Sequence, residues 1–243
     1  MKVIKVKDYQ ELSMVASQII GDLIKQKNDA ILGLATGSTP VGLYKNLISM
    51  YQKNEISFTN IKTYNLDEYC ELPKNHSQSY YTFMHKNLFD HVDIKEENIH
   101  IPSSVGADLE ALCKDYNNAL KQVKIDLQVL GIGSNGHIGF NEPGTSFEQE
   151  TFIVKLAEKT RMDNKRFFNS INEVPKYAIT MGIKNIMTAK KILLLASGRG
   201  KAEAIKNLIE GELTEQFPAS ILQSHDDVVV IIDEEAASLL KQK

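Results

Sequence analysis

The chain of 243 residues is 42% hydrophobic and 24% charged, so it can bury a full core, and its composition excludes a disordered or fibrous protein. The net charge of −3 comes with no basic run longer than Lys190-Lys191, which argues against nucleic acid or a membrane surface and favours small-molecule partners. Cys70 and Cys113 are too few for a disulfide framework and lack the spacing of a zinc site. The apolar runs are too short to span a bilayer and we see no secretory leader, so we expect a cytoplasmic protein.

Short apolar runs alternate with segments of helical periodicity along the chain. The expected strands are Ala30–Ala35, Ile61–Leu66, Leu127–Ile132, Lys191–Ala196 and Val228–Ile232. The expected helices are Tyr9–Lys27, Val41–Tyr51, Ser79–Phe89, Leu109–Val123, Lys201–Ile209 and Glu234–Lys241. This alternation predicts a single α/β domain over residues 1–243, a doubly wound, mostly parallel, Rossmann-like sheet with helices on both faces. Between Thr145 and Tyr177 we expect no strand but an excursion over the sheet edge, with a lid at about 156–179.

The first expected strand runs into the turn Ala35-Thr36-Gly37-Ser38-Thr39-Pro40, and a helix follows. Thr39 suits the N-cap and Pro40 the first helical position, so the N–H groups of this turn would face whatever lies above it. A helix N-terminus behind a glycine turn favours an anion, typically phosphate. Ordinary capping is the alternative, although capping needs neither Gly37 nor Ser38.

The second expected strand ends in Asn65-Leu66-Asp67-Glu68-Tyr69, which places two adjacent carboxylates at one rim of the sheet. Paired acids are most often solvated surface, yet ligands of α/β sheets bind beyond the carboxyl ends of the strands. We therefore expect a functional role for Asp67.

A glycine-rich loop, Gly131–Gly144, follows the apolar run Leu127–Leu130 and carries His137. Glycines let a backbone turn sharply and approach a ligand, and histidine is the side chain that changes charge near neutral pH. Acid–base chemistry is the first interpretation, and a tight connection without catalysis is the alternative. Gly131–Gly136 also spells the G-x-G-x-x-G dinucleotide fingerprint, but the glycines and proline of Gly139–Gly144 oppose the helix that this fingerprint needs, so we reject nucleotide binding.

Lys201 stands at the start of the helix expected after Lys191–Ala196. The helix macrodipole disfavours a cation at this end, so an anionic ligand explains Lys201 better than capping does. A solvated lysine is the alternative.

Four motifs along the chain carry a family resemblance. They are Leu32–Pro40, Asn65–Tyr69, Gly136–Pro143 and Arg166-Phe167-Phe168. In this order they closely resemble glucosamine-6-phosphate deaminase, and the resemblance covers nearly the whole chain. Its most specific parts are the His-Ile-x-Phe-Asn-Glu-Pro loop and the Asp-Glu-Tyr strand end. The family converts glucosamine 6-phosphate to fructose 6-phosphate and ammonia without a metal or organic cofactor, by opening the sugar ring and moving a proton between C2 and C1.

The resemblance implies a role for each matching residue. A phosphate clamp is matched by Gly37, Ser38, Thr39, Arg166 and Lys201. Asp67 matches the base that moves the C2 proton to C1, and His137 matches the acid/base of ring opening. Glu142 matches the partner that holds one imidazole nitrogen so that the other faces the substrate. Many deaminases have an aspartate where this chain has Asn135, so a complete Asp-His-Glu set does not follow from the resemblance.

Two other functions and the oligomeric state stay open. 6-Phosphogluconolactonase has a similar fold and a similar phosphate-and-histidine arrangement, but its loop typically continues His-Thr-Ala-Ser-Leu-Phe-Pro, unlike His137–Pro143 here. A sugar-phosphate-sensing domain of a transcription regulator can share the fold, although we expect no DNA-binding segment before the strand at Ala30. Longer family members form hexamers with an activator site for N-acetylglucosamine 6-phosphate. For this chain both a monomer and a homo-oligomer stay open.

Overall fold

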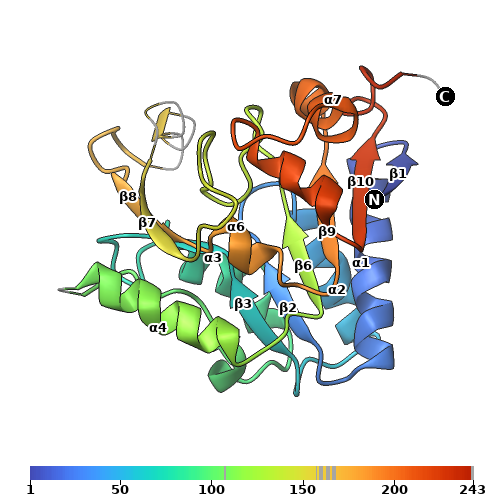
Figure 1. Ribbon diagram of the computed structural model, residues 1–243. Coiled ribbons are helices and arrows are strands. Elements are labelled where there is room, and N and C mark those ends of the chain that lie inside the picture. The colour runs from blue at the N-terminus through green and yellow to red at the C-terminus, as the bar shows by residue number, and fades with distance from the viewer. Residues whose placement is uncertain (107, 157, 159–160, 163–164, 166–167, 242–243) are drawn as a thin grey trace.

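The computed structural model describes residues 1–106, 108–156, 158, 161–162, 165 and 168–241, and strands and helices alternate along most of them (Figure 1). The strands are β1 (Lys2–Val6), β2 (Ile31–Leu34), β3 (Lys62–Asn65), β4 (Asp67–Tyr69), β5 (Ile99–His100), β6 (Leu127–Leu130), β7 (Phe152–Lys155), β8 (Tyr177–Thr180), β9 (Ile192–Ala196) and β10 (Val228–Asp233). The α-helices are α1 (Tyr9–Gln26), α2 (Val41–Gln52), α3 (Tyr80–Asn87), α4 (Leu109–Lys121), α6 (Ile183–Ile186) and α7 (Ala202–Glu210). Short 3-10 helices are η1 (Phe89–His91), η2 (Glu96–Asn98), η4 (Arg199–Lys201) and η5 (Pro218–Ser224).

A parallel sheet of seven strands, in the order β1-β10-β9-β6-β2-β3-β5, forms the centre of the molecule. The predicted doubly wound fold is confirmed, and all five expected strands are present as β2, β3, β6, β9 and β10. The strands β6, β9 and β10 are buried along their whole length, which explains their unbroken apolar sequence. The pattern missed β1 and β5 at the two sheet edges: β1 interrupts its apolar residues with Lys2 and Lys5, and β5 has only two residues.

A second, antiparallel sheet of three strands, in the order β4-β8-β7, stands beside the parallel one. The expectation of no strand between Thr145 and Tyr177 is wrong, because β7 lies inside that interval and β8 begins at its end. These strands are short and partly exposed, so they lack the apolar run of a buried strand. Asp67 pairs with Thr180 in this sheet. The last residues assigned to the lid therefore belong to a strand that supports Asp67.

Two local expectations also fail. The segment from Glu234 to Lys241 forms turns instead of a helix. Only Ala237 donates its N–H four residues back, to the Asp233 carbonyl, as in an α-helix, whereas Ser238 and Leu240 donate three residues back. Thr39 does not cap α2: Pro40 is the N-cap residue and has no side-chain bond, while the hydroxyl of Tyr9 accepts the Gly42 N–H at 2.8 Å.

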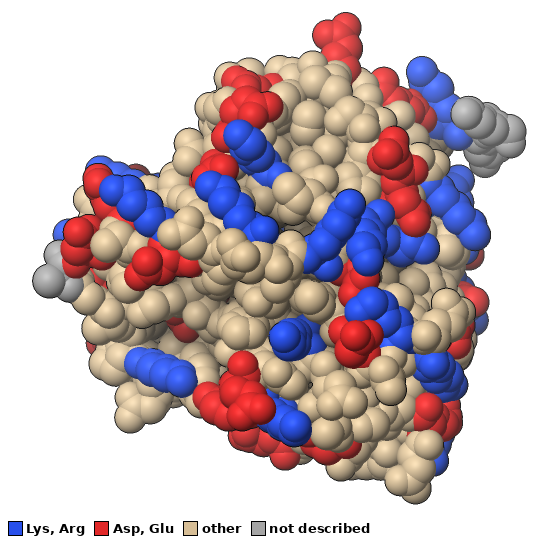
Figure 2. Space-filling view, turned by 60° about the horizontal axis from the view of Figure 1, so that its bottom comes forward, with Lys and Arg blue, Asp and Glu red and all other residues tan. Residues whose placement is uncertain are grey.

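Charged side chains of both signs are interspersed on the face of the molecule that Figure 2 shows. Ion pairs on the surface of the molecule include Lys121 with Glu150 and Lys184 with Glu148. Lys190 forms an ion pair with Asp126. Burial raises the pKa of Asp126, but the hydrogen bonds from Lys190, the Ile31 N–H and Lys27 outweigh burial and lower this pKa below its ordinary value. None of the described helices is both long and apolar enough to cross a membrane.

Candidate active site

A cavity of about 310 Å³ opens where the carboxyl ends of the parallel strands meet. Five segments contribute to its wall: the turn before α2, the start of β4, the start of α3, the loop after β6 and the turn before α7. The described residues that line it include Thr36, Gly37, Ser38, Thr39, Asp67, Tyr80, His137, Phe140 and Lys201. The structure thus brings together every described residue that the sequence analysis proposed for the clamp, with Asp67 and His137. The loop after β6, which is yellow-green in Figure 1, rises above this edge of the sheet.

The turn before α2 presents backbone to the cavity. Gly37 has φ of +96°, a conformation that favours glycine, and Gly37 and Ser38 are exposed. The first N–H groups of a helix have no carbonyl partner within the helix and carry partial positive charge, which suits an anion. This geometry matches the anion turn that the sequence predicted, although the cap residue differs.

Asp67 lies at the edge of the cavity and is only 6% exposed. Burial, together with the neighbouring Glu68 carboxylate, raises the pKa of Asp67 to about 8. A Cβ atom placed on Gly139 would lie 3.5 Å from Oδ2 of Asp67, so the histidine loop passes directly beside this carboxyl group. An acid that holds a proton near neutral pH, next to a histidine loop, can accept or deliver a proton.

Glu68 has a different role, although it neighbours Asp67 in sequence. Its carboxylate is 5% exposed and accepts the N–H groups of Tyr69 at 2.8 Å, Tyr80 at 2.9 Å and Tyr81 at 2.9 Å. Two of these N–H groups belong to the first turn of α3, where Ser79 is the N-cap. Glu68 therefore fixes the start of α3, which carries Tyr80 into the cavity wall.

His137, Asn135 and Glu142 form a chain of contacts. The Asn135 Oδ1 atom lies 2.8 Å from Nδ1 of His137, and the Asn135 Nδ2 group donates to Oε2 of Glu142 at 2.8 Å. Glu142 is 3.6 Å from the same imidazole nitrogen. Glu142, which is expected to hold the ring, lies within ion-pair distance of Nδ1, and Asn135 lies within hydrogen-bond distance of both groups. An amide oxygen on Nδ1 selects the tautomer with its proton there, which leaves Nε2 as an acceptor.

The loop that carries His137 is fixed by close backbone packing. A Cβ atom on Gly133 would overlap the His137 ring, so only glycine lets the ring lie this close. The Gly133 N–H donates to the carbonyl of His137 at 2.9 Å. The Phe140 N–H donates to the Thr180 hydroxyl at 3.1 Å, which ties the loop to the strand opposite Asp67. The described residues 131–151 between β6 and β7 form turns and no helix, so the Gly131–Gly136 stretch does not open the helix that the dinucleotide fingerprint needs.

Lys201 reaches the cavity from the turn before α7. Its Nζ atom donates to the carbonyl of Ile132 at 2.7 Å and lies at the cavity wall. Gly198 (φ +89°) opens this turn, and its N–H donates to the Asp233 carboxylate at the end of β10. Arg166, the other basic residue expected in the clamp, lies outside the described residues.

The sequence analysis missed two aromatic residues of the cavity wall, Tyr80 and Phe140. Their rings are stacked with centroids 6.2 Å apart at 11°, and burial raises the pKa of Tyr80 well above its ordinary value. Phe140 lies within a recognised motif, and Tyr80 follows a good N-cap residue, but neither signal tells which aromatic faces a cavity. Among the described residues, no three His, Cys, Asp or Glu side chains gather to hold a metal ion.

The site joins a turn at a helix N-terminus, a buried acid and a histidine loop at the carboxyl edge of a parallel sheet, the edge at which α/β proteins bind their ligands. The model of the family "Glucosamine-6-phosphate isomerases/6-phosphogluconolactonase" matches residues 8–231, and the chain belongs to this family. The chain is 56% identical over 241 residues to the glucosamine-6-phosphate deaminase of Thermoanaerobacter sp. (strain X514), covering 99% of this chain and 95% of the relative. It is 54% identical over 244 residues to the glucosamine-6-phosphate deaminase of Clostridium botulinum (strain Alaska E43 / Type E3), covering 100% and 98%.

Solved structures give the same picture. A monomeric glucosamine-6-phosphate deaminase superposes with a TM-score of 0.96 at 52% identity, covering 98% of this chain and 100% of that one. The 6-phosphogluconolactonase of Trypanosoma brucei reaches a TM-score of 0.80 at 20% identity, covering 99% and 98%. At that identity the lactonase shows a common fold and nothing more.

Proposed function

We propose that this protein is a glucosamine-6-phosphate deaminase, which converts glucosamine 6-phosphate and water to fructose 6-phosphate and ammonia. The observation that carries the proposal is one cavity that joins an anion turn, Asp67 and the Asn135-supported His137. Relatives of that name at 52–56% identity along nearly the whole chain favour it over the lactonase.

The turn of Gly37, Ser38 and Thr39 holds the phosphate of the substrate, with Lys201 beside it. Backbone N–H groups and an ammonium group form charge-assisted hydrogen bonds to phosphate oxygens, and these fix the sugar in one orientation. Arg166 keeps the role that the motif implies, as a further cation of the clamp.

His137 acts in ring opening. With Nδ1 turned to Asn135, Nε2 takes the proton of the C1 hydroxyl and returns a proton to the ring oxygen, so the ring opens without a net proton change. Glu142 holds the Asn135 amide in the orientation that this tautomer needs.

Asp67 moves the proton from C2 to C1. With its pKa at about 8, this acid is protonated at neutral pH, and the positively charged amine of the substrate favours its ionised form. The carboxylate then removes the C2 proton and delivers it to C1, while a proton passes from the amine nitrogen to O1, which leaves a hydroxymethyl group at C1 and an imine at C2. Water replaces the nitrogen, and ammonia departs.

We include in this proposal a monomeric state, a cytoplasmic location and a lid. The monomer is supported by the monomeric relative of 52% identity, and the cytoplasm by two buried thiols, Cys70 and Cys113, that form no disulfide. The lid is limited to the segment between β7 and β8, since β8 itself is paired with β4.

The test is an assay of purified protein with glucosamine 6-phosphate in the presence of a chelator. We expect ammonia and fructose 6-phosphate in equal amounts. Hydrolysis of 6-phosphogluconolactone without ammonia release would favour the lactonase, and binding without turnover would favour a sensing domain.

A further inference from the structure

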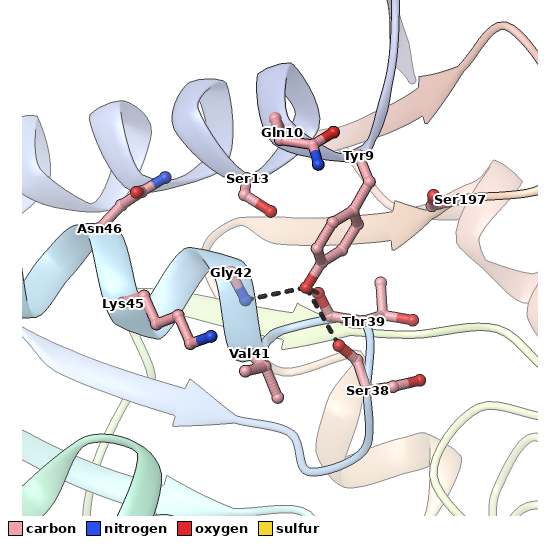
Figure 3. Close-up of a pocket in the computed structure, with 10 residues that line it drawn as sticks. All are labelled: Tyr9, Gln10, Ser13, Ser38, Thr39, Val41, Gly42, Lys45, Asn46 and Ser197. Carbon is pink, nitrogen blue, oxygen red and sulfur yellow. Dashed lines mark hydrogen bonds between the residues drawn. The ribbon is translucent and has the colours of Figure 1, made fainter.

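A second hollow lies directly behind the phosphate turn. It measures about 570 Å³ and lies between the start of α1 and the start of α2, where Tyr9, Ser13, Gly42 and Lys45 line it (Figure 3). Ser38 and Thr39 line both this hollow and the candidate active site. These two residues are therefore accessible from both cavities.

The hydroxyl of Tyr9 reaches across this hollow to the turn. It accepts a hydrogen bond from the Gly42 N–H at 2.8 Å (Figure 3). Its one proton faces two acceptors, the Ser38 carbonyl at 3.1 Å and the Thr39 carbonyl at 3.0 Å. A single group thus joins the first turn of α2 to the carbonyls of the loop before it. Because peptide groups are planar, fixing the Ser38 carbonyl also fixes the N–H group of Thr39, whereas the Thr39 carbonyl fixes the peptide that leads into Pro40 at the start of α2.

The approach of α1 to α2 is what brings Tyr9 within reach. Asp8 caps α1 by accepting the Glu11 N–H, which places Tyr9 at the first helical position. A Cβ atom on Gly42 would overlap the Ser13 hydroxyl and come within 3.0 Å of the Tyr9 hydroxyl, so glycine is needed for this helix contact. Tyr9, Gly42 and Ser13 therefore act as one unit on the far side of the turn from the substrate.

We propose that Tyr9 is a positioning residue of the phosphate site: its hydroxyl holds the backbone of Ser38 and Thr39 in the orientation that binds phosphate. The inference rests on the proposed function for the identity of the substrate. The binding of inorganic phosphate can be measured without the deamination reaction. Tyr9 does not touch the cavity, so its contribution is to binding of the phosphate and not to proton transfer.

The experiment compares wild type, Tyr9→Phe and, as a matched control, Tyr51→Phe at the other end of α2. Tyr9→Phe keeps the ring and removes one hydroxyl. We expect KM for glucosamine 6-phosphate and the dissociation constant for inorganic phosphate each to rise by about fivefold, with kcat unchanged. Tyr51→Phe should leave all three constants at the wild-type values.

A second variant covers the case in which Tyr9→Phe does not fold. In Gly42→Ala the added Cβ atom collides with the Ser13 hydroxyl and crowds the Tyr9 hydroxyl, which pushes α1 and Tyr9 away from α2. This variant should weaken phosphate binding in the same way. Unchanged phosphate affinity in the folded variants, or a fall in kcat with unchanged affinity, would overturn the inference. A wild type that binds phosphate but releases no ammonia would refute the proposed function and leave the phosphate comparison valid.

Discussion

Asp67 is a carboxylic acid that this fold keeps in its uncharged form. It is nearly buried next to Glu68, and its pKa is raised to about 8, whereas an aspartate in an unfolded chain titrates near 3.9. Between these two values the folded protein holds a proton that the unfolded chain has released. The free energy of unfolding therefore falls as pH rises through this window.

Asp67→Asn should stabilise the protein at alkaline pH and destroy its activity. The amide cannot ionise, so the variant does not lose stability as pH rises through this window. The difference in free energy of unfolding between variant and wild type should therefore shift in favour of the variant by about 2–4 kcal/mol from pH 5 to pH 9. Turnover should fall by about 10²–10⁴-fold because the base is lost. Urea unfolding at the two pH values measures the first effect, with Asp115→Asn on the exposed face of α4 as control. Near-normal turnover would exclude Asp67 as the base.

Glu142 acts on His137 through the amide of Asn135. The Glu142 carboxylate accepts from Nδ2 of Asn135 and so turns Oδ1 toward the imidazole. In Glu142→Gln the new amide can donate to Oδ1, which would let Asn135 turn its NH2 group to the ring and select the wrong tautomer. We expect kcat to fall by about 10–100-fold, the equivalent of a charge-assisted hydrogen bond. Glu148→Gln, an exposed position near the loop, should leave kcat unchanged.

Asn135→Asp adds a charge where the amide oxygen now lies, 2.8 Å from Nδ1 of His137. A negative charge there favours the protonated ring, so the basic limb of the pH–rate profile should move to higher pH. The new carboxylate would also face Glu142, and the double variant Asn135→Asp/Glu142→Gln separates the two effects. An unchanged profile in folded Asn135→Asp would show that position 135 does not influence the ring electrostatically.

At the scale of secondary structure, the start of α3 depends on one buried carboxylate. Glu68 accepts three N–H groups, and burial raises its pKa while those N–H groups limit the rise. Glu68→Gln turns one acceptor into a donor that faces N–H groups, so we expect a loss of about 1–3 kcal/mol in the free energy of unfolding. It also removes a charge beside Asp67, whose titration should move to lower pH. Glu97→Gln on the surface is the control, and an equal effect there would contradict the capping role.

The elements that the sequence predicted are those with one dominant pattern. Unbroken apolar runs identified β6, β9 and β10, because these strands are covered on both faces. The sequence did not predict the antiparallel sheet, because β4 consists of Asp-Glu-Tyr and has no apolar run. The strand β4 is stabilised by pairing with β8, more than 100 residues later in the chain. Such pairings are set by tertiary contacts that local periodicity does not contain.

At the scale of the whole molecule, the sequence located the candidate site but not its internal contacts. Turns at the carboxyl ends of parallel strands meet at one edge, so Gly37, Asp67, His137 and Lys201 could be grouped from their order alone. That Asn135 lies between His137 and Glu142, and that Tyr9 supports the turn from behind, depends on side-chain directions. Those directions follow from packing across segments that are far apart in the sequence.

A monomer with one candidate active site should show hyperbolic saturation with its substrate. The proposed monomeric state predicts a mass of 27.3 kDa by light scattering at concentrations used for the assay. Cooperative equilibrium binding requires coupled sites, and one candidate site per chain gives none without association. We therefore expect a Hill coefficient of about 1 for glucosamine 6-phosphate and a specific activity independent of protein concentration. Sigmoidal saturation, accompanied by a larger mass, would show that the chain works as an oligomer with communicating sites.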